Sequence, residues 1–442
     1  MLQFRFITEK WWSMTIVDRN APAADSAPLP DPTPTRSPVR LHFVGRRGDY
    51  WRLMIRGGFL QAITLGIYRF WLFTDMRRFL WTSTEVEGEI LEYTGTAAEL
   101  LIGFLIAIGI LLPIYALFFL ASLEMGVISR VSGLVAFVTL AGFGQYAIYR
   151  ARRYRLTRTV FRGLRFLQRG SAVSYALRAM LWWIPIIVTL GLSSPWATAN
   201  LERYKMRHTF YGNLGGGFGG SGGQLFWRAI WIWLVVFGPL FASAATIEVI
   251  DWSIVTPVLA RRGNIVNFIA ALPSKELIGI AVLVGGPALS VLFGLVLYPA
   301  YQAIVMRWWL GGLRLGGAAA ASDLPMRCYY GAYLRCLLYV LLFSIALFTV
   351  ASLAVGNPVD FDPQPLRRND LAVGLAVLAY VVFIVGCSTI YQVVVKMRLW
   401  QVAVESVAIS GIAALDDVRA GEATSSAVGE GLADALGAGV GI

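Results

Sequence analysis

Polar side chains recur inside stretches of this sequence that are otherwise apolar, and a membrane accepts such residues only at a cost. Four are glutamines, and two are threonines that begin Thr-Leu-Gly triplets. They are Gln61, Gln145, Gln302, Gln392, Thr64 and Thr189. Their amide and hydroxyl groups predict a polar cavity between membrane helices, with the triplets as helix breaks whose backbone lines a site. The alternatives are hydrogen bonds between helices, anchoring at the interface and close packing at glycine.

Arginines are the second informative group. The run from Arg150 to Gly170 holds eight arginines and no acidic residue. Its first part predicts contacts with anionic lipid headgroups or with a partner protein; these residues are Arg150, Arg152, Arg153, Arg155 and Arg158. The net charge of +12 also raises the question of nucleic acid. Because the arginines flank apolar segments, we expect no nucleic-acid partner and assign the charge to membrane topology.

The residue inventory lacks the constellations that enzymes use. Histidine occurs only at His42 and His208, and the three cysteines form no paired framework. The motifs HExxH, CxxC and the P-loop are absent. A GxGxxG match within Gly215–Gly223 follows no buried strand, which predicts a flexible linker before the next helix. We therefore expect no enzymatic activity, no catalytic residue, no metal and no cofactor.

Membrane helices are the elements that would position these residues. Hydrophobic residues make up 57% of the 442 positions and charged residues 14%, against about 25% charged residues in a soluble domain. Six windows are long and apolar enough to cross a bilayer: 97–123, 126–149, 224–246, 277–305, 333–355 and 371–395. Two further apolar stretches, 53–73 and 173–199, carry arginines and helix breakers. The predicted fold is an all-α polytopic membrane protein with six to eight membrane helices.

The chain matches itself when it is shifted by 125 residues. The matches pair Tyr50 with Tyr175, Thr64-Leu65-Gly66 with Thr189-Leu190-Gly191, Trp71 with Trp196, Thr84 with Thr209, and Gly95 with Gly220. An ungapped register of this kind predicts an internal repeat, with units near 48–122 and 173–247.

A shorter pattern follows several of the predicted helices. Thr84, Thr159 and Thr209 each stand at the start of a β-prone run that turns at a glycine three or four residues later. Such runs predict short β-hairpins on the cytoplasmic side, and we expect them to meet in a small sheet.

The basic segments define the predicted topology. Both 150–170 and the segment with Arg203, Lys205 and Arg207 are expected in the cytoplasm, yet only 173–199 lies between them. A re-entrant element, broken at proline and glycine, resolves the conflict, and its counterpart 53–73 would behave likewise. The chain then crosses a bacterial inner membrane six times and has both termini in the cytoplasm. The rival is a plain eight-span protein whose first repeat is inverted.

Several of these segments resemble the YjgN-like family of bacterial inner-membrane proteins, a domain of unknown function (898). The resemblance rests on Phe43–Arg52, Thr64-Leu-Gly-Ile-Tyr68 with Trp71, Thr189-Leu-Gly191 with Pro195-Trp196, and Tyr204, Thr209 and Gly212. It covers most of 43–410 and is strongest in the first two units. In the second unit Leu192-Ser193-Ser194 departs from the Ile-Tyr of the first. The resemblance implies a location and a fold but no activity, and it hints at a membrane-protease partner.

We divide the chain into five parts: a disordered tail 1–40, membrane units 41–170 and 171–326, a shorter helical-hairpin unit 327–413, and a flexible tail 414–442. Two functions fit these parts. The first is transport of a small molecule, ion or lipid through the duplicated broken elements. The second is a non-catalytic scaffold or regulator that docks a cytoplasmic or membrane-protease partner. The lipid bilayer is the expected surrounding of either, and the oligomeric state stays open.

Overall fold

The computed structural model describes residues 37–123, 127–260, 271–355, 370–416 and 418. Most of each predicted tail lies outside these residues. The described parts of the tails have regular structure, because Val39–Arg40 forms strand β1 and Ile412–Leu415 forms a short 3-10 helix.

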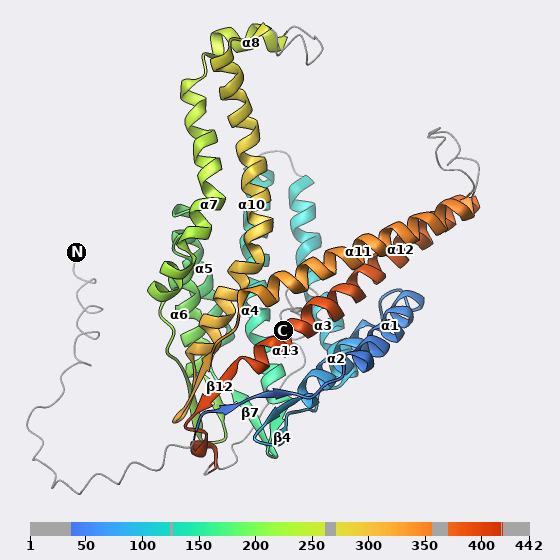
Figure 1. Ribbon diagram of the computed structural model, residues 1–442, viewed down its shortest axis with the longest axis vertical. Coiled ribbons are helices and arrows are strands. Elements are labelled where there is room, and N and C mark those ends of the chain that lie inside the picture. Colours follow the sequence, from blue (N-terminus) through green and yellow to red (C-terminus); the bar gives the residue numbers. More distant parts are fainter. Residues whose placement is uncertain (1–36, 124–126, 261–270, 356–369, 417, 419–442) are drawn as a thin grey trace, which may run out of the picture. The chain divides into compact units, whose positions relative to one another are not determined.

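Six helices of the described chain are long and apolar enough to cross a membrane, which confirms the predicted fold class. They are α3 (Ala97–Leu123), α4 (Val127–Thr157), α7 (Gly222–Val249), α10 (Ser274–Gly312), α11 (Met326–Val355) and α12 (Asp370–Tyr391). A π-helical segment (Gln392–Met397) joins α12 to α13 (Arg398–Glu405), and the short α8 (Trp252–Ala260) follows α7. Figure 1 shows α7 beside α10 and α11 beside α12. Their large apolar side chains are widely exposed, as expected for surfaces solvated by lipid.

Each of the two interrupted apolar stretches forms a pair of shorter helices that pack against each other. The first pair is α1 (Arg47–Ile63) and α2 (Arg69–Thr82), and the second is α5 (Ala172–Val188) and α6 (Ser194–Arg207). The break falls on the Thr-Leu-Gly triplet in both pairs.

The two breaks have the same backbone geometry. Leu65 and Gly66 have φ of 50° and 90°, and Leu190 and Gly191 have φ of 48° and 89°. In each turn the threonine hydroxyl donates to the carbonyl four residues earlier and accepts from the amide four residues later. A threonine therefore closes both turns, and the left-handed conformation of the next two residues reverses the chain.

The predicted hairpins form, and their strands pair across the molecule. The strands are β1 (Val39–Arg40), β2 (His42–Phe43), β3 (Thr84–Val86), β4 (Glu89–Ile90), β5 (Glu92–Tyr93), β6 (Thr159–Phe161), β7 (Leu164–Gln168), β8 (Thr209–Tyr211), β9 (Leu214–Phe218), β10 (Leu313–Leu315), β11 (Ala318–Ser322) and β12 (Val407–Ser410). One sheet has the order β1-β12-β11-β10-β9-β8-β7-β6-β5, and the other has the order β2-β3-β4. The expectation that the hairpins meet in a sheet is confirmed.

The two sheets close into one ring. Leu41 alone separates β1 from β2, and its amide donates to the carbonyl of Val407 in β12, whereas the amide of Val44 donates to the carbonyl of Ser83, just before β3. Successive amides of a strand point to opposite edges, so this one strand joins β12 to β3. Leu91 links β4 and β5 in the same way, with its amide directed to Thr84. The described strands thus form a closed antiparallel ring of ten, counting β1 with β2 and β4 with β5 as single strands.

The interior of the ring is apolar and filled. Val86, Phe161 and Tyr211 are buried there together with Ile412, and Leu415 packs against them. The hydroxyl of Tyr211 donates to the carbonyl of Phe161 at 2.8 Å. An eight-stranded barrel is about as wide as its own side chains can fill, and in this wider ring the segment after β12 adds the remaining apolar groups.

The glycine-rich stretch predicted as a flexible linker is ordered instead. Residues 214–218 form β9, which pairs with β8 and β10, and α7 begins at Gly222. A Cβ atom on Gly216 would lie 2.7 Å from the carbonyl oxygen of Met206. The glycine is therefore needed where the strand passes close to the end of α6, and the linker prediction was wrong because it treated composition alone.

Candidate functional site

A cavity of about 410 Å³ lies where five helices lead into the strand ring. The helices α2, α4, α6, α10 and α13 each contribute to its wall. We call this cavity the chamber. It is lined by four basic residues, Arg77, Arg152, Arg155 and Lys205, by one acid, Glu202, and by three indoles, Trp81, Trp309 and Trp400, together with Thr159 and six other apolar side chains. Its volume lies in the range of small-molecule sites.

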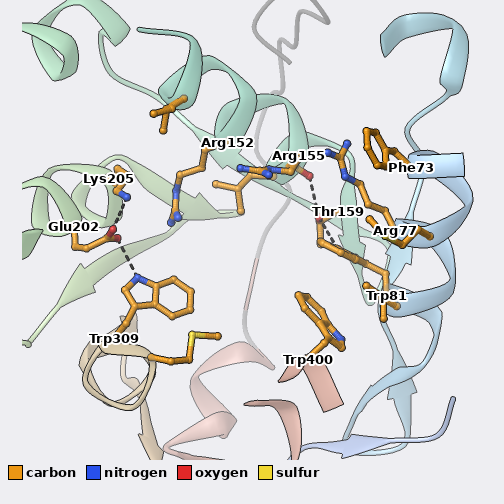
Figure 2. Close-up of a pocket in the computed structure, with 15 residues that line it drawn as sticks. Phe73, Arg77, Trp81, Arg152, Arg155, Thr159, Glu202, Lys205, Trp309 and Trp400 are labelled. Carbon is orange, nitrogen blue, oxygen red and sulfur yellow. Dashed lines mark hydrogen bonds and ion pairs between the residues drawn. The ribbon is translucent and has the colours of Figure 1, made fainter. Parts of the chain in front are cut away.

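Two arginines and two indoles of the lining face each other across the chamber. Figure 2 shows Arg152 and Arg155 on one side and Trp309 and Trp400 on the opposite side. Glu202 with Lys205 occupies one end, and Arg77 with Trp81 occupies the other.

The threonines at the start of the strands hold the chamber's wall in place. The hydroxyls of Thr84, Thr159 and Thr209 each donate to the carbonyl four residues earlier, which ties the last helical turn to the strand. Two of these hydroxyls also accept from indoles: Trp81 donates to Thr159 at 2.9 Å and Trp400 donates to Thr84 at 3.1 Å. The rings of Trp81 and Trp400 stack with centroids 5.0 Å apart.

Glu202 is the internal counter-ion of the chamber. Its carboxylate accepts from the Lys205 ammonium and, at 3.0 Å, from the indole of Trp309. Burial lowers the pKa of Lys205 from its ordinary value, and the nearby charge of Glu202 opposes that shift. The remaining basic groups of the wall lie on α2 and α4.

Arg152 keeps donor capacity that the described residues do not use. Its Nη2 contacts the sulfur of Met206 at 3.1 Å, and its buried Nε has no hydrogen-bond partner among them. A buried donor without a partner costs about 1–3 kcal/mol. Arg77 differs, since its guanidinium donates to the hydroxyl of Tyr93 at 3.3 Å.

The predicted arginines divide into those inside and those outside the chamber. Arg152 and Arg155 line it, whereas Arg150 and Arg153 are half-buried on other faces of α4. Arg158 forms an ion pair with Glu99, which also accepts from the hydroxyl of Tyr154. Contact of any of these arginines with lipid or a partner stays a prediction.

The structure places the predicted glutamines and threonines outside the chamber lining. Thr64 and Thr189 close the two helix breaks, and the carbonyl of Gln61 accepts from Gly66 in the first of them. Gln302 accepts from the hydroxyl of Tyr333 at 2.7 Å, a bond between α10 and α11. Gln145 is half-buried on α4, and Gln392 is buried in the π-helical segment with its Oε1 unpaired among the described residues. A polar cavity built from these six residues stays a prediction.

Sequence reasoning missed most of the chamber, although a signal for it was present. Counting back seven residues from the first residue of β3, β6, β8, β10 and β12 gives Arg77, Arg152, Glu202, Met306 and Trp400, and all five line the chamber. Counting back four residues gives Leu80, Arg155, Lys205, Trp309 and Ala403, and all of these except Ala403 line it as well. Residues at i and i+3 share one face of a helix. Thr84, Thr159 and Thr209 are the first residues of β3, β6 and β8. Counting back from these threonines in the sequence would therefore have located the chamber positions on α2, α4 and α6.

A metal site would need at least three histidine, cysteine, aspartate or glutamate side chains close together. The described part of the chain contains no such group.

The six long apolar helices of the described chain define a polytopic α-helical membrane protein. The chain belongs to the family described as "Bacterial protein of unknown function (DUF898)", whose profile matches residues 38–435, and the resemblance seen in the sequence is thereby confirmed. No curated protein and no solved structure matches the chain.

Proposed function

We propose that this protein transports a small anionic solute across a bacterial inner membrane and binds it in the chamber. The observation that carries the proposal is the charge of the lining, with four basic side chains against one carboxylate. A buried excess of positive charge is costly without an anion to balance it. The proposal gives the chamber a binding role and assigns it no bond-making or bond-breaking step.

The ring supports a transport cycle with a closed side. The five chamber helices run directly into strands whose interior is packed with Phe161, Tyr211 and Ile412. In this conformation an anion in the chamber is separated from the far side of the ring by apolar side chains. A transporter needs such a barrier on one side of its site at a time.

The strand pairing supports the six-crossing topology with re-entrant α1–α2 and α5–α6. β2 precedes α1 and pairs with β3, which follows α2; β7 and β8 enclose α5–α6 in the same way. Paired strands lie on one side of a membrane, so each broken element returns to the side from which it started. The eight-span rival would put paired strands on opposite sides.

Helix length and exposure point in the same direction. The 17-residue helices α1 and α5 are about 25 Å long, shorter than the roughly 30 Å hydrocarbon core. Their turns expose Leu65 (91%) and Leu190 (49%), as expected for tips inserted in lipid. With the arginine-rich ring side in the cytoplasm, both termini are cytoplasmic. The shared geometry of the two turns supports an internal duplication.

A scaffold role is the second candidate, and the arginines outside the chamber favour it. Arg150 and Arg153 stand on α4 but line no wall of the chamber. Together with the ordered strand ring they would present a basic surface to anionic lipid or to a cytoplasmic or membrane-protease partner.

Uptake into proteoliposomes tests the transport proposal. The probes are radiolabelled benzoate, hexyl phosphate and inorganic phosphate, with the full chain in zwitterionic lipid. We expect uptake of at least one anion, a loss of at least tenfold in Arg152→Gln, and unchanged uptake in Arg150→Gln. Uptake of none by folded protein, or equal loss in both variants, would contradict the proposal.

Labelling of single cysteines tests the topology separately. Arg169, on the ring side, and Leu65, at the first turn, are each replaced by cysteine after Cys328, Cys336 and Cys387 are changed to serine. We expect a charged maleimide to label position 169 only from the cytoplasmic side and position 65 from neither side. Labelling of position 169 from the periplasm would refute the orientation.

A further inference from the structure

The lining of the chamber is more apolar than a site for a simple ion needs. Nine of its fifteen residues are apolar or aromatic, and they come mainly from α2, α10 and α13. An inorganic anion among the arginines would leave this surface against water, which is unfavourable. An occupant that carries its own apolar group would cover the surface and gain free energy in doing so.

The basic side of the lining has the chemistry of a phosphate site. Three of the four basic residues are arginines, whose planar guanidinium matches two oxygens of a phosphate at once. Arg152 has a buried Nε without a partner among the described residues, and a phosphate oxygen would accept from it. This unused donor is a second observation, independent of the net charge, that points to a bound anion.

Glu202 restricts where the negative charge of an occupant can lie. It occupies Lys205 and the indole nitrogen of Trp309 at one end of the chamber. The negative charge of the occupant therefore belongs beside Arg152 and Arg155, across from Trp309 and Trp400. The chamber thus has a charged side and an aromatic side that face each other.

We propose that the chamber binds an anionic amphiphile, a phosphate monoester joined to an apolar body, with the phosphate at Arg152 and Arg155 and the apolar body against the indoles of Trp309 and Trp400. This inference rests on the proposed anion-binding role of the chamber and adds the class of substrate. The same chemistry occurs in a soluble alkyl or aryl phosphate and in a lipid headgroup with the start of its chain.

Calorimetric titration of the purified full chain in an uncharged detergent tests the inference. The probes are hexyl phosphate, inorganic phosphate and hexanol. We expect hexyl phosphate to bind at least about tenfold more tightly than inorganic phosphate or hexanol. Only hexyl phosphate places a phosphate beside the arginines and an apolar chain beside the indoles. Nanodiscs with and without phosphatidic acid form a further arm. Competition against hexyl phosphate only in discs that contain phosphatidic acid would identify the lipid headgroup as the source, and its absence would identify a soluble phosphate.

Two pairs of variants locate the binding. Arg152→Gln is expected to weaken hexyl phosphate by about tenfold to a hundredfold, the loss of a charge-assisted bond, and Arg150→Gln to leave it unchanged. Trp309→Leu is expected to weaken hexyl phosphate but not inorganic phosphate, and the lipid-exposed Trp227→Leu to change neither. Arg155→Gln serves in place of Arg152→Gln if that variant fails to fold.

The outcomes separate the two proposals. Equal affinity for hexyl phosphate and inorganic phosphate would overturn the amphiphile and keep the anion chamber. Binding of hexanol as tight as that of hexyl phosphate, or equal losses in Arg152→Gln and Arg150→Gln, would overturn the amphiphile and the anion chamber together. Binding of none of the phosphate probes by folded protein would do the same.

Discussion

Lys205 and Glu202 lie one helical turn apart on α6 and contact each other in the chamber, which three arginine side chains also line. Burial is the main reason that the pKa of Lys205 falls below its ordinary value. A lysine is charged below its pKa, so the lowered value brings its loss of charge closer to physiological pH. If the chamber binds an anion as proposed, loss of this charge weakens the binding.

We therefore predict that binding of hexyl phosphate weakens as pH rises through the lowered pKa of Lys205, before an ordinary lysine would titrate. The titration runs from about pH 7.5, where the phosphate is already a dianion, to about pH 10.4, the ordinary lysine value. Lys205→Arg keeps its charge over this range and is expected to give a flatter profile. Identical profiles for the wild type and Lys205→Arg would show that another group is titrating.

The sequence drew attention to basic residues but did not place them in the fold. Arg152 and Arg155 were predicted to contact anionic lipid headgroups or a partner protein; that contact stays a prediction, and the structure shows that both line the chamber. The glutamines were informative as polar residues in apolar helices, but Gln302 meets Tyr333 from the next helix, and that pairing depends on how α10 and α11 pack. Periodicity within one helix carries no information about the neighbouring helix.

The two helix breaks depend on an unusual backbone conformation at their glycines. Gly66 and Gly191 have φ near +90°, and a Cβ atom at either would have nothing within 4 Å. Any penalty for alanine at these sites must come from backbone conformation, because no neighbour is in the way.

We predict that Gly66→Ala and Gly191→Ala each destabilise the protein by about 1–3 kcal/mol, the range for strained backbone positions. Gly109→Ala is the matched control, because it also has open space but lies inside α3, where alanine favours the helix. Thermal unfolding in an uncharged detergent measures all three. A loop variant as stable as the control would refute the argument from φ.

Sequence patterns located the elements well and their ends poorly. The apolar window 277–305 predicted a membrane helix, but α10 continues to Gly312. The additional turns carry Met306 and Trp309 into the chamber and end where β10 begins. A hydrophobicity window detects only the part of a helix that meets lipid.

In the whole molecule, the pairing of β1 with β12 closes the strand ring. Val39 stands opposite Ile409 in the register of these two strands, and both side chains pack toward the ring interior. Paired residues of this kind have Cα atoms about 4.5–5.5 Å apart, within reach of a disulfide.

We predict that Val39→Cys with Ile409→Cys forms an intramolecular disulfide under mild oxidation, in a background where Cys328, Cys336 and Cys387 are serine. The measurement is loss of maleimide labelling that returns on reduction. Val39→Cys with Phe166→Cys is the control, because β7 lies elsewhere in the ring. Equal cross-linking of both pairs would mean that the strands are not held in this register.

The ring as a whole was beyond the reach of the sequence. Turn residues such as Gly88 and Gly163 predicted single hairpins, and both have the positive φ that such turns require. The pairing of one hairpin with another depends on how five helix pairs pack, because each helix pair brings the chain back to the strand ring. No local pattern records that arrangement.

The partners that close the ring are some 370 residues apart in the chain. At about 5–20 residues per second, a ribosome needs roughly 20–70 seconds to deliver β12 after β1 has emerged. During that interval the growing chain has a strand edge exposed at each end of the unfinished sheet, the kind of edge that pairs with other chains. Overproduction should therefore favour mispairing between nascent copies. Slower translation alone would not relieve it, because the missing partner, β12, is the last of the described strands to be made.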